Sequence, residues 1–155
     1  MKKLYFILIL FTTLNSMAQN KKNYFIHFTS DPMVNPSAAI MSINAASEAL
    51  KQGHNVTYFA AGDGVRILLK DVINNLHTVT AHGGGFGKIS QMAENLFLDF
   101  SNLGGIIHVS EGSFATYGVN QDNHKEHLID VSKIFWSYPK QLIQESSKAD
   151  IVFSY

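Results

Sequence analysis

Short hydrophobic runs alternate with helix-like segments along this chain, and this alternation constrains the fold more than any other feature of the sequence. The runs are rich in aromatic and β-branched residues, as buried strands are. Buried strands that alternate with helices form a parallel sheet joined by right-handed crossovers. We therefore expect an α/β fold with a small, doubly wound, mainly parallel sheet and helices on both faces, its strands lying at 23–28, 55–61, 106–109 and 149–154.

The helices between these strands are marked by their termini and by their apolar spacing. Asn35 and Pro36 resemble an N-cap followed by proline at the first helical position, and Gly53 is a typical C-terminal stop for a helix over 37–52. Further helices are predicted at 65–70, 89–102, within 110–118, and over 124–147 with a break near Pro139. The last helix is expected to carry three aromatic residues that belong to the core or, as the alternative, form an oligomer contact: Phe135, Trp136 and Tyr138.

The first eighteen residues have the three parts of a secretory signal peptide. Lys2 and Lys3 are positively charged, residues 4–14 form an apolar run, and Ser16-Met17-Ala18 is a small-x-small cleavage site. The apolar run has 11 residues, whereas a helix that spans a bilayer needs about 20. We expect cleavage after Ala18, a single mature domain over 19–155, a periplasmic or secreted location, and no stable membrane anchor.

The charge balance and the lack of cysteine exclude several classes of function. Lys and Arg together number 12, as do Asp and Glu, and loss of Lys2 and Lys3 leaves 12 − 2 = 10 basic residues and a net charge of −2. A chain with this charge and one arginine offers no positive field to a nucleic acid. The lack of cysteine excludes disulfides, cysteine-ligated zinc, thiolate catalysis and a lipid-modified cysteine, and we expect no cofactor.

Candidate ligand-binding residues lie in the segments that follow the strands. In a doubly wound fold the carboxyl ends of the strands meet at one edge of the sheet, and ligands bind there. Segments 29–35, 61–64 and 110–113 should meet at this edge, and the glycine loop 82–87 could join them. The candidate residues in and beside these segments are Ser30, Asp31, Asn35, Gly62, Asp63, Gly64, Arg66, Ser110 and Ser113.

One stretch of the sequence has the pattern of a known family. Residues 53–65 (GHNVTYFAAGDGV) follow a helix that ends in Gly-His and combine a hydrophobic strand with a Gly-Asp-Gly-Val turn, and they resemble the DsrE/DsrF-like family. The strand NYFIHF with its Asp-Pro loop, the strand GGIIHV and the closing strand ADIVFSY are similar to that family in outline. The resemblance covers roughly residues 23–155.

The resemblance implies a mainly parallel sheet of five strands and assembly into homotrimers or hexamers. Active members of the family relay sulfur as a persulfide on a cysteine just after the third strand. The matching positions here read Ser110-Glu111-Gly112-Ser113, and serine neither carries a persulfide nor ionises near neutral pH as a thiol does. The resemblance therefore supports the fold and argues against the family's chemistry.

The candidates at the strand ends also have purely structural interpretations. Ser110 could contact a ligand or cap a short helix, whereas the Gly-x-Ser-x-Gly pattern of a nucleophile elbow is absent. The turn at 62–64 could bind an anion at a helix N-terminus, or Asp63 could serve as an N-cap. Arg66 could clamp a carboxylate or phosphate, or make a surface or subunit contact. The loop at 82–87 could bind an anion or pack in an oligomer.

His124 and His127 are weak candidates for a metal site. On a helix their spacing places both imidazoles on one face, which suits Zn, Cu or Ni. Two ligands make a weak site, and the alternative is a solvated helix face. His27, His54 and His108 sit in or beside strands, and we expect them to be hydrogen-bonded core or rim residues.

From these observations we expect an exported protein that has lost thiol chemistry and works as a homo-oligomeric ligand-binding or accessory protein, with a small anionic molecule as the candidate ligand. Three alternatives remain open: a subunit of a sulfur relay whose thiols come from a partner, a histidine-based periplasmic metal-binding protein, and a hydrolase that uses no cysteine. No residue is assigned a catalytic role.

Overall fold

The computed structural model describes residues 20–77 and 88–155 of the chain. Within them, five parallel strands form one sheet in the order β4-β3-β2-β1-β5. The expected α/β fold with a parallel sheet is therefore confirmed, whereas the predicted leader (1–18) and the glycine loop (82–87) lie outside the described residues. The strands are β1 (Asn23–Phe28), β2 (Asn55–Ala60), β3 (Ile106–Ser110), β4 (Ile134–Ser137) and β5 (Ile151–Ser154).

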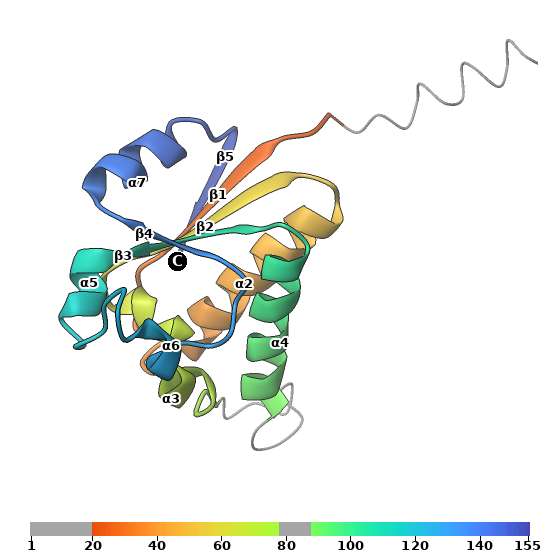
Figure 1. The fold of residues 1–155 in the computed structure, drawn as a ribbon. Coiled ribbons are helices and arrows are strands. Elements are labelled where there is room, and N and C mark those ends of the chain that lie inside the picture. Colours follow the sequence, from red (N-terminus) through yellow and green to blue (C-terminus); the bar gives the residue numbers. More distant parts are fainter. Residues whose placement is uncertain (1–19, 78–87) are drawn as a thin grey trace, which may run out of the picture.

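Helices lie on both sides of the sheet. Figure 1 shows α2 and α4 against one face and α7 against the other. In the described part of the chain, no helix is both long and apolar enough to cross a bilayer. The helices are α2 (Pro36–Lys51), the 3₁₀ helix η1 (Gly62–Leu68), α3 (Lys70–Ile73), α4 (Lys88–Asn102), α5 (Glu111–Ala115), α6 (His124–His127) and α7 (Pro139–Ser146).

The main core lies between the sheet and the pair α2 and α4. Ile26, Tyr58 and Ile107 occupy one register across three strands, and all three are fully buried. The Tyr58 ring packs edge-on against Phe97 of α4, with ring centroids 5.2 Å apart. Its hydroxyl lies 2.8 Å from the hydroxyl of Ser42 on α2. One aromatic side chain thus joins both helices to the sheet.

Strand β4 corrects the sequence analysis, which placed Phe135 and Trp136 on a helix. Both lie on β4, where Phe135 pairs with His108 and Trp136 with Val109 of β3. Trp136 packs against the core, but Tyr138 is 55% exposed and precedes α7, so it is not a core residue. The strand was missed because it has four residues at the edge of the sheet, too few to show an alternating pattern.

The segment after β2 also differs in detail from the prediction. A short helix was expected at 65–70, but the chain forms η1 from Gly62 and then a separate turn of helix, α3. The segment that follows α6 is tied to the end of η1, because Ile129 donates its amide to the Leu68 carbonyl at 3.0 Å and Leu69 forms a bridge with Leu128. Two segments about 60 residues apart in the chain are thereby held side by side.

Candidate functional site

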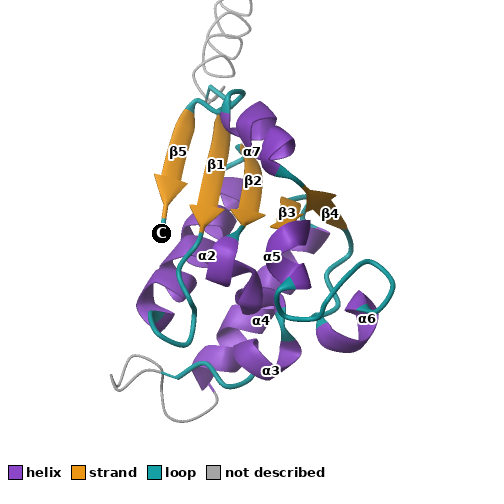
Figure 2. Cartoon of the chain, turned by 90° about the vertical axis from the view of Figure 1, so that its left-hand side faces the viewer, coloured by secondary structure: helices purple, strands orange, loops and turns teal. Residues whose placement is uncertain are grey.

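The carboxyl ends of β1, β2 and β3 lie next to one another, as the parallel arrangement requires (Figure 2). Strand β2 leads after one residue into η1, and β3 leads directly into α5. Residues 29–35, 61–64 and 110–113 are therefore brought to one edge of the sheet, as the sequence predicted. We call the hydrogen-bonded polar residues at this edge, which are Asp31, Gly62, Asp63, Arg66, Ser110, Ser113 and Tyr117, the strand-end network.

Gly64 sets how closely η1 approaches the end of β1. A Cβ atom at this position would lie 2.4 Å from the carbonyl oxygen of Phe28. The Gly64 amide donates to the Thr29 carbonyl at 3.1 Å, which holds the two backbones together. Gly64 is buried, so its role is close packing, and the exposed edge of the turn is formed by Gly62 and Asp63.

The two serines form a chain of hydrogen bonds that links β3 to η1. Ser113 donates its hydroxyl to the Ser110 hydroxyl at 2.9 Å, and it accepts the Gly62 amide at 2.9 Å. The Ser110 hydroxyl also accepts the Ser113 amide at 3.3 Å, so Ser110 is the N-cap of α5. The capping interpretation of Ser110 is confirmed, and both hydroxyls are engaged within the protein.

His108, two residues before Ser110 in the chain, forms its side-chain hydrogen bond with β4 and not with Ser110. Its Nδ1 lies 2.8 Å from the hydroxyl of Ser137 on β4, and both residues are buried. Burial lowers the pKa of His108 below its ordinary value of 6.5, which favours the neutral ring. Ser110 therefore lacks, among the described residues, the hydrogen-bonded base that a serine nucleophile requires.

The charged residues of the network form a second set of contacts. The Asp31 carboxylate pairs with the Arg66 guanidinium and accepts the Met33 amide at 2.9 Å. The guanidinium carbon of Arg66 lies 5.6 Å from the centre of the Tyr117 ring. The Tyr117 hydroxyl donates to the Asp63 carboxylate at 2.5 Å, and this bond raises the pKa of Tyr117. The Asp31 carboxylate thus pairs with the guanidinium and the Asp63 carboxylate with the phenol, and the contact of Arg66 with the Tyr117 ring joins the two pairs.

Tyr117 is the member of this network that sequence reasoning missed. It lies 54 positions after Asp63, and only the end of α5 brings its hydroxyl to that carboxylate. The interpretation of Asp63 as an N-cap is wrong, because Ala61 occupies the N-cap position of η1 and forms no side-chain cap. Asp63 instead lies inside the first turn, which leaves its carboxylate free to accept from Tyr117.

Asn35 and Ser30 do not join the network. The Asn35 side chain accepts the Ala38 amide at 3.1 Å and caps α2, as the sequence predicted. Ser30 lies at a bend after β1, and its hydroxyl makes no hydrogen bond within the described residues. Asn35 therefore serves the helix, while Ser30 is placed beside Asp31 without contacting the other candidates.

The two candidate metal ligands lie on the single turn of α6. His124 donates from Nδ1 to the Gln121 carbonyl at 2.7 Å, and its ring meets the Trp136 ring edge-on with centroids 5.7 Å apart. His127 is exposed. Across residues 20–77 and 88–155, no three His, Asp or Glu side chains gather in a way that could hold a metal ion.

Comparisons with known proteins find a matching family model and solved structures with a similar fold. The sequence model of the DsrE/DsrF-like family matches residues 22–155. The crystal structure of the YchN protein from E. coli is similar with a TM-score of 0.58 and 14% identity, covering 87% of this chain and 99% of that one. The structure of the conserved protein of unknown function BT1422 from Bacteroides thetaiotaomicron is similar with a TM-score of 0.53 and 13% identity. This match covers 90% of this chain and 98% of that one. No curated protein matches the sequence.

Proposed function

Because the chain belongs to the DsrE/DsrF-like family and contains no cysteine, we propose that it is an exported accessory protein that binds a small molecule at its strand ends and carries no persulfide. Ser110 stands where the family resemblance places the reactive cysteine, and this substitution is the observation that carries the proposal. Its hydroxyl caps α5 and accepts from Ser113, so it has a structural role in place of a chemical one.

The strand-end network supports ligand binding by its exposure and composition. Gly62, Asp63 and Tyr117 are exposed, and each offers polar atoms to solvent at the edge where doubly wound folds bind ligands. Arg66 is already paired with Asp31, so an anion would have to displace a carboxylate to reach it. With two carboxylates for one guanidinium, the network favours a ligand that donates hydrogen bonds over the anionic ligand suggested by the sequence.

We further propose that the protein is a homo-oligomer, a trimer or hexamer as the family resemblance implies. Strand β5 is at the edge of the sheet, and two apolar residues on it, Val152 and Phe153, are 53% and 41% exposed. An edge strand with exposed apolar side chains is a surface on which another chain can pack. The pattern of the first eighteen residues supports export to the periplasm.

Native mass spectrometry tests these proposals together. The protein is expressed with its own leader, recovered from the periplasmic fraction without added metal, and measured as wild type and as two matched variants. We expect an oligomer with one small-molecule adduct per chain, an Asp63→Asn variant that lacks the adduct, and an Asp122→Asn variant that retains it. Asp122 is an exposed carboxylate outside the network, which makes it the control for a change of charge.

Three results would contradict the proposal in different ways. An adduct that persists in Asp63→Asn would place the ligand elsewhere on the protein. An oligomer without any adduct would favour a scaffold role over ligand binding. Co-purification with a homologue that contains cysteine would instead support a subunit of a sulfur relay whose thiols come from the partner.

A further inference from the structure

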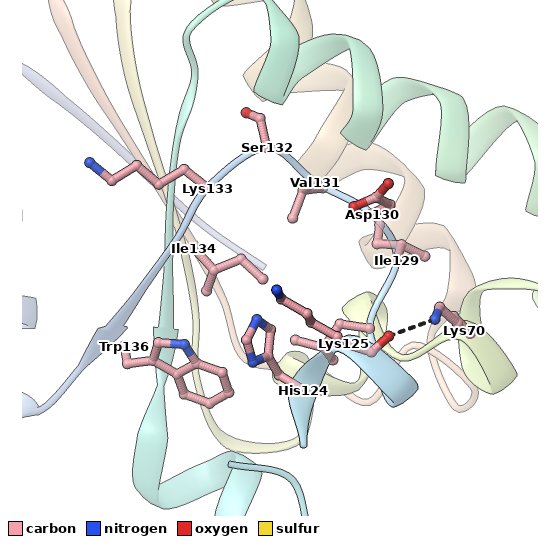
Figure 3. Close-up of a pocket in the computed structure, with 11 residues that line it drawn as sticks. Lys70, His124, Lys125, Ile129, Asp130, Val131, Ser132, Lys133, Ile134 and Trp136 are labelled. Carbon is pink, nitrogen blue, oxygen red and sulfur yellow. Dashed lines mark hydrogen bonds between the residues drawn. The ribbon is translucent and has the colours of Figure 1, made fainter. Parts of the chain in front are cut away.

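A cavity of about 560 Å³ lies between α6, residues 128–134 and β4, and it shares no residue with the strand-end network (Figure 3). We call it the β4–α6 cavity. Cavities that hold small molecules measure about 300–1,000 Å³. The size of the β4–α6 cavity therefore suits a small organic molecule.

The inner wall of the cavity is apolar and fixed in place. Leu128 and Ile129 are each 3% exposed, and Val131 and Ile134 pack against the main core. The wall is held by the bonds that tie residues 128 and 129 to the end of η1. A ligand would thus meet a preformed surface that is apolar at its inner wall and polar over most of the remaining lining, and this reduces the ordering cost of binding.

Of the nitrogen-bearing side chains in the lining, those of His124, Lys125 and Trp136 lie together on one side of the cavity. Figure 3 shows the Lys125 ammonium directed into the cavity beside the His124 ring, with the Trp136 indole at its edge. Within the described residues, neither the Lys125 ammonium nor the Trp136 indole N–H has a hydrogen-bond acceptor. His124 uses Nδ1 on the Gln121 carbonyl, which leaves Nε2 for another partner. The Lys125 ammonium and the Trp136 N–H are therefore two donors that remain available to a ligand.

The other charges around the cavity are engaged elsewhere or lie at its rim. Lys70 donates its ammonium to the Lys125 and Glu126 carbonyls at 2.9 and 3.3 Å. The Lys133 ammonium lies 4.4 Å above the Phe135 ring, outside the cavity. The Asp130 carboxylate is at the rim opposite Lys125, and no ion pair joins it to another described residue.

We propose that the β4–α6 cavity binds a small organic anion. The oxyanion group, a carboxylate in the simplest case, accepts hydrogen bonds from Lys125 and Trp136. The apolar body of the ligand packs against Val131 and Ile134. Two features favour this class: an ammonium and a neutral N–H donor beside the same space suit an acceptor with negative charge, and the apolar inner wall offers contacts to hydrocarbon that a bare inorganic ion cannot use.

The cavity carries its own spectroscopic reporter, because Trp136 is the single tryptophan of the chain. The purified full-length protein is titrated with cyclohexanecarboxylate while its tryptophan fluorescence is recorded. Inorganic phosphate serves as the bare oxyanion and cyclohexanecarboxamide as the neutral analogue. We expect a saturable change in emission with the carboxylate, and binding at least about tenfold weaker for each of the other two probes.

Two lysine variants locate the binding site. Lys125→Gln removes the unpaired ammonium and should weaken carboxylate binding about tenfold or more, because a charge-assisted hydrogen bond is lost. Lys140→Gln removes the same charge from an exposed position on α7 and should bind as the wild type does. Lys125 is itself exposed, so its replacement leaves the core intact.

Three outcomes overturn the proposal: no saturable change in emission, equal weakening by the two lysine variants, or phosphate or carboxamide binding as tightly as the carboxylate. The first excludes a ligand site at Trp136, and the second indicates unspecific attraction by net charge. Carboxylate binding by Asp63→Asn should equal that of the wild type, because the two sites share no residue. The failure of the strand-end proposal and the failure of this one can therefore be told apart.

Discussion

The two faces of the sheet are built on different principles. The face toward α2 and α4 is filled by apolar side chains and one tyrosine, and two helices of about four turns seal it. The opposite face is covered by α7, a helix of 8 residues. This opposite face of the sheet carries alternating imidazole and phenyl rings in one register across four strands. The rings belong to His27, Phe59, His108 and Phe135.

We call these four side chains the ring row, and they pack against one another by stacking rather than by interdigitation. The His108 ring lies between Phe59 and Phe135, parallel to both within 17°, with centroids 5.6 and 5.0 Å away. His27 meets Phe59 edge-on at 6.1 Å. The Nε2 atom of His27 is buried and has no hydrogen-bond partner within the described residues. The face toward α2 and α4 thus depends on packing and one buried hydrogen bond, whereas the other face also depends on the protonation state of two histidines.

The largest expected effect on stability comes from the sheet face toward α2 and α4, which we call the sealed face. Phe97→Ala removes a fully buried ring that packs on Tyr58, and such a change costs about 3–5 kcal/mol of unfolding free energy. Phe135→Ala on the ring row should cost clearly less, because Phe135 is half-buried on an edge strand. Urea unfolding of both variants measures the difference. Equal losses would show that the two faces contribute alike.

A smaller effect is expected from the tyrosine hydroxyl of the sealed face. In Tyr58→Phe the hydrogen bond to the Ser42 hydroxyl is lost while the ring packing remains, so we expect a loss of about 1 kcal/mol. Tyr24→Phe is the control, because the Tyr24 hydroxyl makes no hydrogen bond within the described residues. Urea unfolding at neutral pH compares the two, and a neutral Tyr58→Phe would show that this bond adds nothing to the stability.

The pH dependence of stability should come in part from the ring row. Burial lowers the pKa of both His27 and His108 below the ordinary value of 6.5. Below pH 6.5 these two histidines bind protons more readily in the unfolded chain than in the folded one. Their contribution to the free energy of unfolding is therefore fully present above pH 6.5 and is lost as the pH is lowered. We expect the double variant His27→Leu/His108→Leu to show a shallower fall in thermal unfolding temperature.

The control for this pH effect is His77→Leu, which removes an exposed histidine. Its unfolding temperature should fall with pH as steeply as that of the wild type. If His77→Leu flattened the profile as much as the double variant did, the acid sensitivity would come from surface charge and not from the ring row.

The smallest expected effect concerns the outer end of the ring row. The Lys133 ammonium lies 4.4 Å above the Phe135 ring, and at an exposed position such a contact contributes about 0.5–1 kcal/mol. Lys133→Met should lose this amount in urea unfolding, whereas Lys133→Arg should retain it. If both variants unfolded as the wild type does, the row would end at Phe135 without support from the cation.

Much of the fold could be predicted from the sequence, because its main elements carry local signals. Strands β1, β2, β3 and β5 are hydrophobic runs bounded by polar or glycine residues, and α2 has its cap and its proline at the expected positions. Strand β4 carries no such signal. One residue separates its four residues from Pro139, and the same residues suit a helix that breaks at proline.

The strand-end network was predictable only in part. Parallel strands bring their carboxyl ends together wherever they occur, so the meeting of the segments after β1, β2 and β3 follows from fold class. Tyr117 could not be predicted, because its contact with Asp63 depends on where α5 stops. The β4–α6 cavity could not be predicted either, because its position depends on the tertiary structure. Its walls come from Lys70, α6 and an edge strand that the sequence did not reveal.

The pairing of β5 with β1 has a consequence for how the chain folds during synthesis. It joins residues 127 positions apart, as in the bond from the Asn23 amide to the Asp150 carboxylate. At about 5–20 residues per second, β1 emerges from the ribosome roughly 6–25 s before its outer neighbour exists. Throughout that interval the edge of β1 that will pair with β5 stays open. The sheet therefore closes last beside the strand that was made first, and until then a chaperone can bind the nascent chain.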